Sequence, residues 1–269
     1  MTTLETTYDT TTTRSIGVLP NDRPRTGSIL RSERIKFFST RSPWWCMALA
    51  TVTAIGLGML IAGTSPPGEN RLYFTMSGLQ FAQIIVMVMA TIAITSEYRF
   101  GTIRTGFLAS PHRGRVLWTK AAMVAVMALV FGEMLAFATF FLAKLVANDD
   151  VLVLSGSVAW RQVAGYGVVY ALSALIAIAV GALVRQTAGA ISLLLVWTLL
   201  VESLVVLIPR VGDDITRFLP FNNATLFAAD REMTGIVDPL NVWASLGIFA
   251  TTAIVLMFAA TAVIKRRDA

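Results

Sequence analysis

The polar segment EYRFGTIRT, Glu97–Thr105, separates two long apolar runs of this chain. The run before it ends near residue 96, and the run after it begins near residue 117. Each run has the length of about 20 apolar residues that an α-helix needs to cross a bilayer. A charged, glycine-containing segment between two such runs is either a solvated loop or a surface on which another protein docks. The flanking runs decide the fold class, and the polar segment bears on function.

The composition agrees with a membrane fold. Of 269 residues, 55% are hydrophobic and only 14% are charged, and the mean hydropathy is +0.69. Soluble domains average about 25% charged residues. The net charge of +6 comes from basic residues that cluster just outside the apolar runs. This placement is typical of membrane proteins and argues against a nucleic-acid partner.

The sequence has few of the residues and motifs that form disulfides, metal sites or ATP-binding sites. The single Cys46 excludes an internal disulfide and any Cys-rich metal site. The sequence has no G-x-x-x-x-G-K-[ST] phosphate loop, so we do not expect this chain to hydrolyse ATP. His112 is the only histidine, and the possible metal ligands are not closely spaced. We therefore predict no catalysis and no cofactor in this polypeptide.

Six stretches are long and apolar enough to be transmembrane helices, and none alternates like a barrel strand. They cover residues 46–63, 75–96, 117–145, 162–184, 188–208 and 241–264. The prediction is an all-α integral membrane protein with one six-helix domain, residues 28–269. Residues 1–27 are polar and have no apolar core, which predicts a disordered cytoplasmic tail rather than a signal peptide.

The lysines and arginines predict the orientation. With the N-terminus inside, 16 of the 22 basic residues fall on the inner side, as the positive-inside rule requires. Trp44, Trp45 and Trp118 then fall at the inner interface, where indole rings are favoured. Both termini are therefore expected in the cytoplasm.

Three regions outside the spans have helical features. Residues 28–42 mix apolar and basic side chains and predict a helix lying on the inner membrane surface, although a solvated basic linker remains open. The outer connections 146–161 and 209–240 mix apolar residues with turn formers and predict short helices, with plain loops as the alternative.

The polar loop after the second span also predicts a short helix parallel to the membrane, over residues 97–108. Glu97 would stand at its N-terminus, where the helix dipole favours an acid. Gly101 would let another backbone approach closely. Pro111 would stop the helix, because proline lacks the N–H donor and clashes with the preceding turn.

These motifs occur in an order that resembles the ABC-2 type permeases, the transmembrane subunits of bacterial ABC exporters. Residues 31–45 look like the family's helix that leads into the first span, and residues 181–190 look like its turn between the fourth and fifth spans. With six spans in the same order, the resemblance extends from residue 28 onward. The residues of the loop that carry it are Glu97, Gly101, Thr102, Leu108, Ser110, Pro111, Arg113 and Lys120.

The resemblance implies that residues 97–108 form a coupling helix seated in a groove of a separate ATPase subunit. ATP and magnesium would bind to that partner, and a second permease, identical or different, would complete the membrane part. The protein would be a multi-pass protein of the bacterial plasma (inner) membrane, in contact with lipid. A structural alternative is that these residues only cap a helix and bind lipid phosphate. The implied ATPase-coupling residues are Glu97, Arg99, Gly101, Thr102 and Arg104.

Polar groups inside the spans are candidates for a substrate path. Glu133 lies near the middle of the third span and Glu202 in the outer half of the fifth, where ionisable groups are costly and often functional. Gln80 and Gln83 belong to a polar stripe on the second span. The alternative for each is a structural hydrogen bond between helices. Drugs, peptides, lipids and polysaccharide precursors all remain open, and the two acids favour an amphipathic, cationic molecule.

Three function classes compete. The leading hypothesis is the permease subunit of an ATP-driven exporter. An ion-coupled secondary transporter could use Glu133 and Glu202 as proton carriers, but the two halves show no evident repeat with broken helices. A non-transporting immunity or sensor subunit is the third class.

Overall fold

The computed structural model describes residues 26–64, 71–101, 113–147, 152–208, 212–229 and 240–267, and the regular structure in these ranges is helical. Six helical segments there are long and apolar enough to cross a membrane, which confirms the six predicted spans. The chain therefore has the architecture of a multi-pass helical membrane protein. The spans are α2 (Arg41–Thr64), α3 (Arg71–Arg99), α5 (Arg113–Ala147), α6 and α7 (Gly156–Ala164, Tyr166–Val184), α8, η1 and α9 (Thr187–Leu195, Val196–Val201, Glu202–Val206), and α12 (Val242–Arg267).

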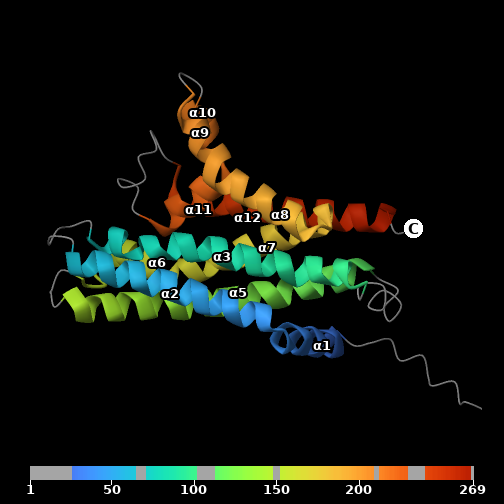
Figure 1. Ribbon diagram of the computed structural model, residues 1–269. Coiled ribbons are helices and arrows are strands. Elements are labelled where there is room, and N and C mark those ends of the chain that lie inside the picture. Colours follow the sequence, from blue (N-terminus) through green and yellow to red (C-terminus); the bar gives the residue numbers. More distant parts are fainter. Residues whose placement is uncertain are drawn as a thin grey trace, which may run out of the picture.

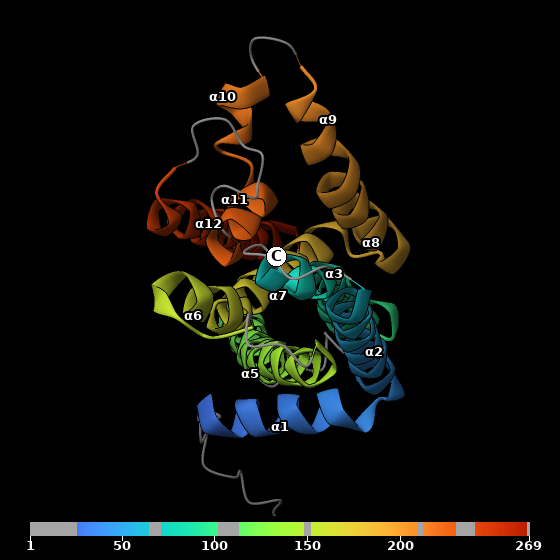
Figure 2. The ribbon, with the colours of Figure 1, turned by 90° about the vertical axis from the view of Figure 1, so that its left-hand side faces the viewer.

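Helix α1 (Thr26–Ser39) lies crosswise at one end of the bundle, whereas α2, α3, α5 and α7 run side by side along it (Figure 1, Figure 2). We call this the α1 end. Arg41, which begins α2, and Arg99, which ends α3, also lie there. The predicted helix over residues 28–42 is thus a helix, although it stops at Ser39 and α2 starts already at Arg41. Pro43 stands in the first turn of α2, where a missing N–H costs nothing. The predicted tail lies almost wholly outside the described residues.

Helix α7 forms the centre of the bundle because small residues bring its neighbours close. A Cβ atom on Gly181 of α7 would stand only 2.6 Å from Cγ2 of Ile94 on α3. On the other side, a Cβ atom on Gly132 of α5 would stand 2.8 Å from the ring of Tyr170 on α7. Three small residues spaced four apart on α7, Ser173, Ala177 and Gly181, are buried. Close approach of backbones is the usual source of helix association in lipid.

The fifth span is the least buried part of the bundle. Helices α8, η1 and α9 lean away from the other spans, as Figure 2 shows. Beyond them lie α10 (Gly212–Thr216) and α11 (Pro220–Ala228), and α11 packs against α12. Short helices therefore do occur in both predicted outer connections, since α6 begins at Gly156 within the first of them.

The prediction that Glu97 begins a separate short helix is wrong. Helix α3 runs without a break to Arg99, so Glu97 lies in its last turn, at the end where the dipole disfavours an acid. The Phe100 N–H still bonds to the Ser96 carbonyl at 2.9 Å. Gly101 then adopts a φ of +69°, the left-handed conformation that ends many helices. Lysines from other helices compensate the charge of Glu97. The rest of the expected coupling helix, residues 102–108, lies outside the described residues.

Candidate functional site at the α1 end

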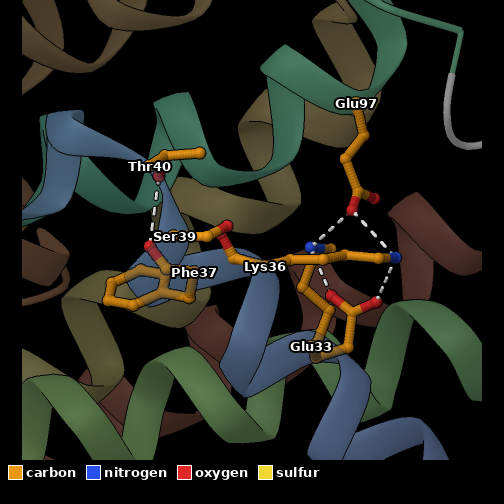
Figure 3. Close-up of polar contacts among 7 residues, drawn as sticks. Glu33, Lys36, Phe37, Ser39, Thr40 and Glu97 are labelled. Carbon is orange, nitrogen blue, oxygen red and sulfur yellow. Dashed lines mark hydrogen bonds and ion pairs between the residues drawn. The ribbon is translucent and has the colours of Figure 1, made fainter.

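Four charged side chains from three helices meet at the α1 end: Glu33 and Lys36 of α1, Glu97 of α3 and Lys120 of α5. We call them the charge cluster. Lys120 Nζ lies 2.5 Å from Glu33 Oε2 and 2.9 Å from Glu97 Oε1. Lys36 Nζ lies 2.9 Å from Glu33 Oε1 and 3.6 Å from Glu97 Oε1. Figure 3 shows the carboxylates of Glu33 and Glu97 on opposite sides of the ammonium groups.

The cluster is mostly withdrawn from water. The side chains of Glu33 and Lys120 are 3% and 6% exposed, that of Glu97 is 13% exposed, and only Lys36 is half exposed. A buried charge is costly unless it is paired. Two ammonium groups and two carboxylates balance one another, and each buried group has a partner from another helix. The cluster therefore fixes α1 and the end of α3 to α5.

The surroundings shift the pKa values of the two α1 residues. Burial by itself raises the pKa of Glu33, but attraction and hydrogen bonds from Lys120 and Lys36 outweigh burial and hold it below the ordinary value. Burial lowers the pKa of Lys36, and hydrogen bonds and attraction from Glu33 and Glu97 more than reverse this, so it lies above its ordinary value. Both groups are therefore charged near neutral pH.

A cavity of about 660 Å³ adjoins the charge cluster. Its wall is formed by the end of α1, the start of α2 and the last three turns of α3, with Lys120 and Thr187 completing it. Glu97, Lys36 and Lys120 thus face both the cluster and the cavity. The lining residues are Lys36, Phe37, Ser39, Thr40, Arg41, Ser42, Pro43, Met89, Ile92, Ala93, Ser96, Glu97, Arg99, Phe100, Lys120 and Thr187.

A second set of contacts joins the end of α3 to the turn between α7 and α8. The guanidinium of Arg185 lies 5.2 Å from the centre of the Tyr98 ring, within the range of a cation–π contact. The Thr187 hydroxyl bonds to the Thr95 hydroxyl at 2.9 Å. Arg185 itself has a φ of +60° and ends α7. Any displacement of the last turn of α3 would therefore reach α7 and α8 as well as α1 and α5.

The predicted ATPase-coupling residues have different surroundings. Glu97 belongs to the charge cluster. Arg99 is exposed, with its guanidinium 5.6 Å from the centre of the Phe100 ring. Gly101 ends α3 in the left-handed conformation, and nothing described lies within 4 Å of the position of its absent Cβ. Thr102 and Arg104 lie outside the described residues.

The polar residues predicted to line a substrate path have different contacts in the bundle. Gln83 is buried and donates a hydrogen bond from Nε2 to the Ser173 hydroxyl of α7 at 2.8 Å, while Gln80 is only half buried. The carboxyl group of Glu133, also half buried, lies against the backbone of Gly167 at the start of α7. Gln83 thus has the structural role weighed as the alternative, and path lining stays a prediction for all three.

Glu202 connects the fifth span to α11. Its carboxylate is buried and accepts hydrogen bonds from the N–H groups of Phe221 at 3.0 Å and Asn222 at 2.7 Å. The Trp197 indole donates a third at 3.1 Å. These backbone N–H groups belong to the first turn of α11, which is favourable for an acid. Glu202 therefore caps a helix, and it faces different neighbours from Glu133.

Sequence reasoning missed Glu33, Lys36 and Lys120 as members of a common site. Two signals were present: Lys120 stands inside an apolar run, where a charge requires a partner, and Glu33 is the only acid of residues 28–42. Neither signal indicates which acid meets which lysine.

The arrangement contains no nucleophile paired with a base, and no group of three metal-ligating side chains lies close together within the described ranges. Its chemistry is electrostatic: it fixes helix ends relative to one another. No model of a known protein family matches this chain, and no curated protein matches its sequence.

Proposed function

We propose that this chain is the permease subunit of an ATP-driven exporter of the ABC-2 type, located in a bacterial plasma membrane. The observation that carries the proposal is the charge cluster. It holds Glu97, the first residue of the segment that resembles a coupling helix, against α1 and α5. A force applied to that segment by an ATPase partner acts directly on the ends of three helices.

The distribution of basic residues supports a cytoplasmic α1 end. Helices α1, α3, α5 and α12 all carry lysines or arginines there, as the positive-inside rule requires of the cytoplasmic side. The end of α12 lies near the start of α5, because a Cβ atom on Gly114 would stand 3.6 Å from Lys265. In this orientation α1 lies along the inner membrane surface and both termini are cytoplasmic.

The partner ATPase would bind ATP and magnesium, and its conformational change would displace helices of this chain. Glu97 and Arg99 make polar contacts with the groove of the ATPase, Gly101 and Thr102 allow close approach, and Arg104 adds a charge contact. Closure of two ATPase subunits displaces the end of α3. The charge cluster passes the displacement to α1 and α5, and the Tyr98–Arg185 contact passes it to α7 and α8. A second permease completes the substrate path.

The test is purification of the tagged chain in mild detergent, with identification of the proteins that co-purify. Wild type should retain an ATPase subunit in roughly equal amount, and substrate export should depend on ATP. Glu97→Gln should reduce export and weaken retention of the ATPase. Asp214→Asn is the matched control, because Asp214 is a largely exposed acid outside the α1 end. Thermal unfolding of each variant separates lost contact from lost folding.

Two outcomes would overturn the proposal. One is a folded wild-type protein that retains no ATPase. The other is a Glu97→Gln variant that exports as well as the control does.

An ion-coupled transporter is the second candidate, favoured by one observation. Oε2 of the Glu133 carboxyl is buried within the third span, beside Gly167 of α7. Export that collapses with an uncoupler and fails in Glu133→Gln, without any ATPase partner, would favour this function.

A further inference from the structure

The cavity beside the charge cluster has an excess of positive charge. Lys36 and Lys120 are balanced by the two carboxylates of the cluster. Arg41 and Arg99 also line the cavity and are exposed, and no described carboxylate lies within ion-pair distance of either. Two exposed guanidinium groups that line the cavity therefore remain available to an anion.

The deeper wall is apolar. Met89, Ile92 and Ala93 line the cavity and belong to the membrane-spanning part of α3. Ser42 and Ser96 also line the cavity. At about 660 Å³ the cavity falls within the range of ligand sites, roughly 300–1,000 Å³. Its chemistry suits a ligand with an anionic head and an apolar body.

The position of the cavity matches the depth of lipid headgroups. Trp44 and Trp45 follow Arg41 on α2 and are exposed, and indole rings favour the headgroup level of a bilayer. A soluble anion would use the arginines but not the apolar wall. A phospholipid uses both, since its phosphate remains at headgroup level while its chains follow the span.

We propose that the cavity binds an anionic phospholipid, with its phosphate between Arg41 and Arg99 and an acyl chain along Met89 and Ile92. Arginine suits this role because its planar guanidinium donates two parallel hydrogen bonds to a phosphate. The bound lipid fills the space between α1, α2 and α3 and lies directly against the charge cluster. The inference does not depend on the exporter proposal, because it concerns the isolated chain and membrane lipid only.

The test uses the full chain in mild detergent with a phosphatidylglycerol analogue that carries a photoactivatable group in one acyl chain. Cross-linked peptides are mapped by mass spectrometry, and unlabelled lipids compete. We expect cross-links on α3 around Met89–Ala93 and displacement by phosphatidylglycerol, with phosphatidylcholine at least roughly fivefold weaker. The double variant R41Q/R99Q should bind the probe roughly thirtyfold more weakly, since each basic residue contributes to attraction of anionic lipid.

The matched control is R34Q/R115Q, which removes the same charge from exposed positions outside the cavity lining. It should bind like wild type. Ala93→Phe offers an independent variant, because it fills the apolar part of the cavity and leaves both arginines in place. It should lower cross-linking as well, which keeps the proposal testable if the arginine variants fold poorly.

Each of four results would overturn the proposal. Phosphatidylcholine could compete as well as phosphatidylglycerol, which would indicate that the site does not select an anionic headgroup. R41Q/R99Q and R34Q/R115Q could weaken binding equally, which would indicate general surface charge alone. Inorganic phosphate or pyrophosphate could displace the probe at low concentration, which would indicate a soluble anion. Cross-links could map away from α3.

Discussion

We expect Lys120 to stabilise the α1 end more than any other single side chain of the charge cluster. It stands between Glu33 and Glu97, and its own side chain is only 6% exposed. Replacement by methionine preserves most of the volume but leaves two carboxylates with Lys36 as their remaining partner. Breaking a buried ion pair by removing one partner costs about 3–5 kcal/mol. Because Glu97 is 13% exposed and Lys36 remains, we expect a loss of about 3 kcal/mol, the lower end of that range.

Lys36→Met is the matched comparison. Lys36 touches the same two carboxylates, but its side chain is half exposed, so water can replace it. A partly exposed pair contributes about 1 kcal/mol or less. The double variant E33Q/K120M provides a second check. Removing the charge of Glu33 should recover part of the loss caused by Lys120→Met, because Lys36 then balances one carboxylate, that of Glu97, instead of two.

The measurement is the free energy of unfolding in mixed micelles, followed by circular dichroism as the denaturing detergent is increased. A difference of about 2 kcal/mol between Lys120→Met and Lys36→Met is expected from the two costs. Equal losses in the two variants would refute the reasoning. An additive further loss in E33Q/K120M would refute it too, since it would mean that Lys36 alone is enough to balance both carboxylates.

Two further predictions follow from the same structure. Because Lys120 and Lys36 outweigh burial and hold the pKa of Glu33 below its ordinary value of 4.5, ionised Glu33 stabilises the fold fully above that value. Wild type should therefore lose thermal stability more steeply than Glu33→Gln as pH falls below about 4.5; parallel curves would contradict this. Glu202→Leu should leave the first-turn N–H groups of α11 unpaired and weaken the packing of α11 against the fifth span by about 2–3 kcal/mol. The measurement is hydrogen exchange, which should become faster at the amides of Phe221 and Asn222. Ser203→Ala, an exposed neighbour, should leave that exchange unchanged.

Much of the fold follows from local sequence because bilayer crossing is a local requirement. A run of about 20 apolar residues forms a helix in lipid whatever its neighbours are, since its backbone groups have no other partners. All six predicted spans are therefore present.

The end of α3 shows where local reasoning fails. Dipole arguments place an acid at the start of a helix, and on that basis Glu97 was expected to begin one. The structure places it in a final turn because Lys36 and Lys120 supply the positive charge that the helix end lacks. Those lysines are 61 residues before and 23 residues after Glu97 in the sequence. The residues that adjoin Glu97 in the sequence therefore do not show which positive charges balance it.

The sequence by itself determined the spans, the bias of basic residues toward one end and the positions of costly charges. Only the tertiary structure decided which charges meet, that Glu202 caps α11, and that Arg41 and Arg99 line a common cavity. The physical reason is how far apart in the sequence the interacting groups lie. Hydrophobic transfer depends on each segment alone, whereas a buried ion pair or a cavity depends on side chains that only helix packing brings together.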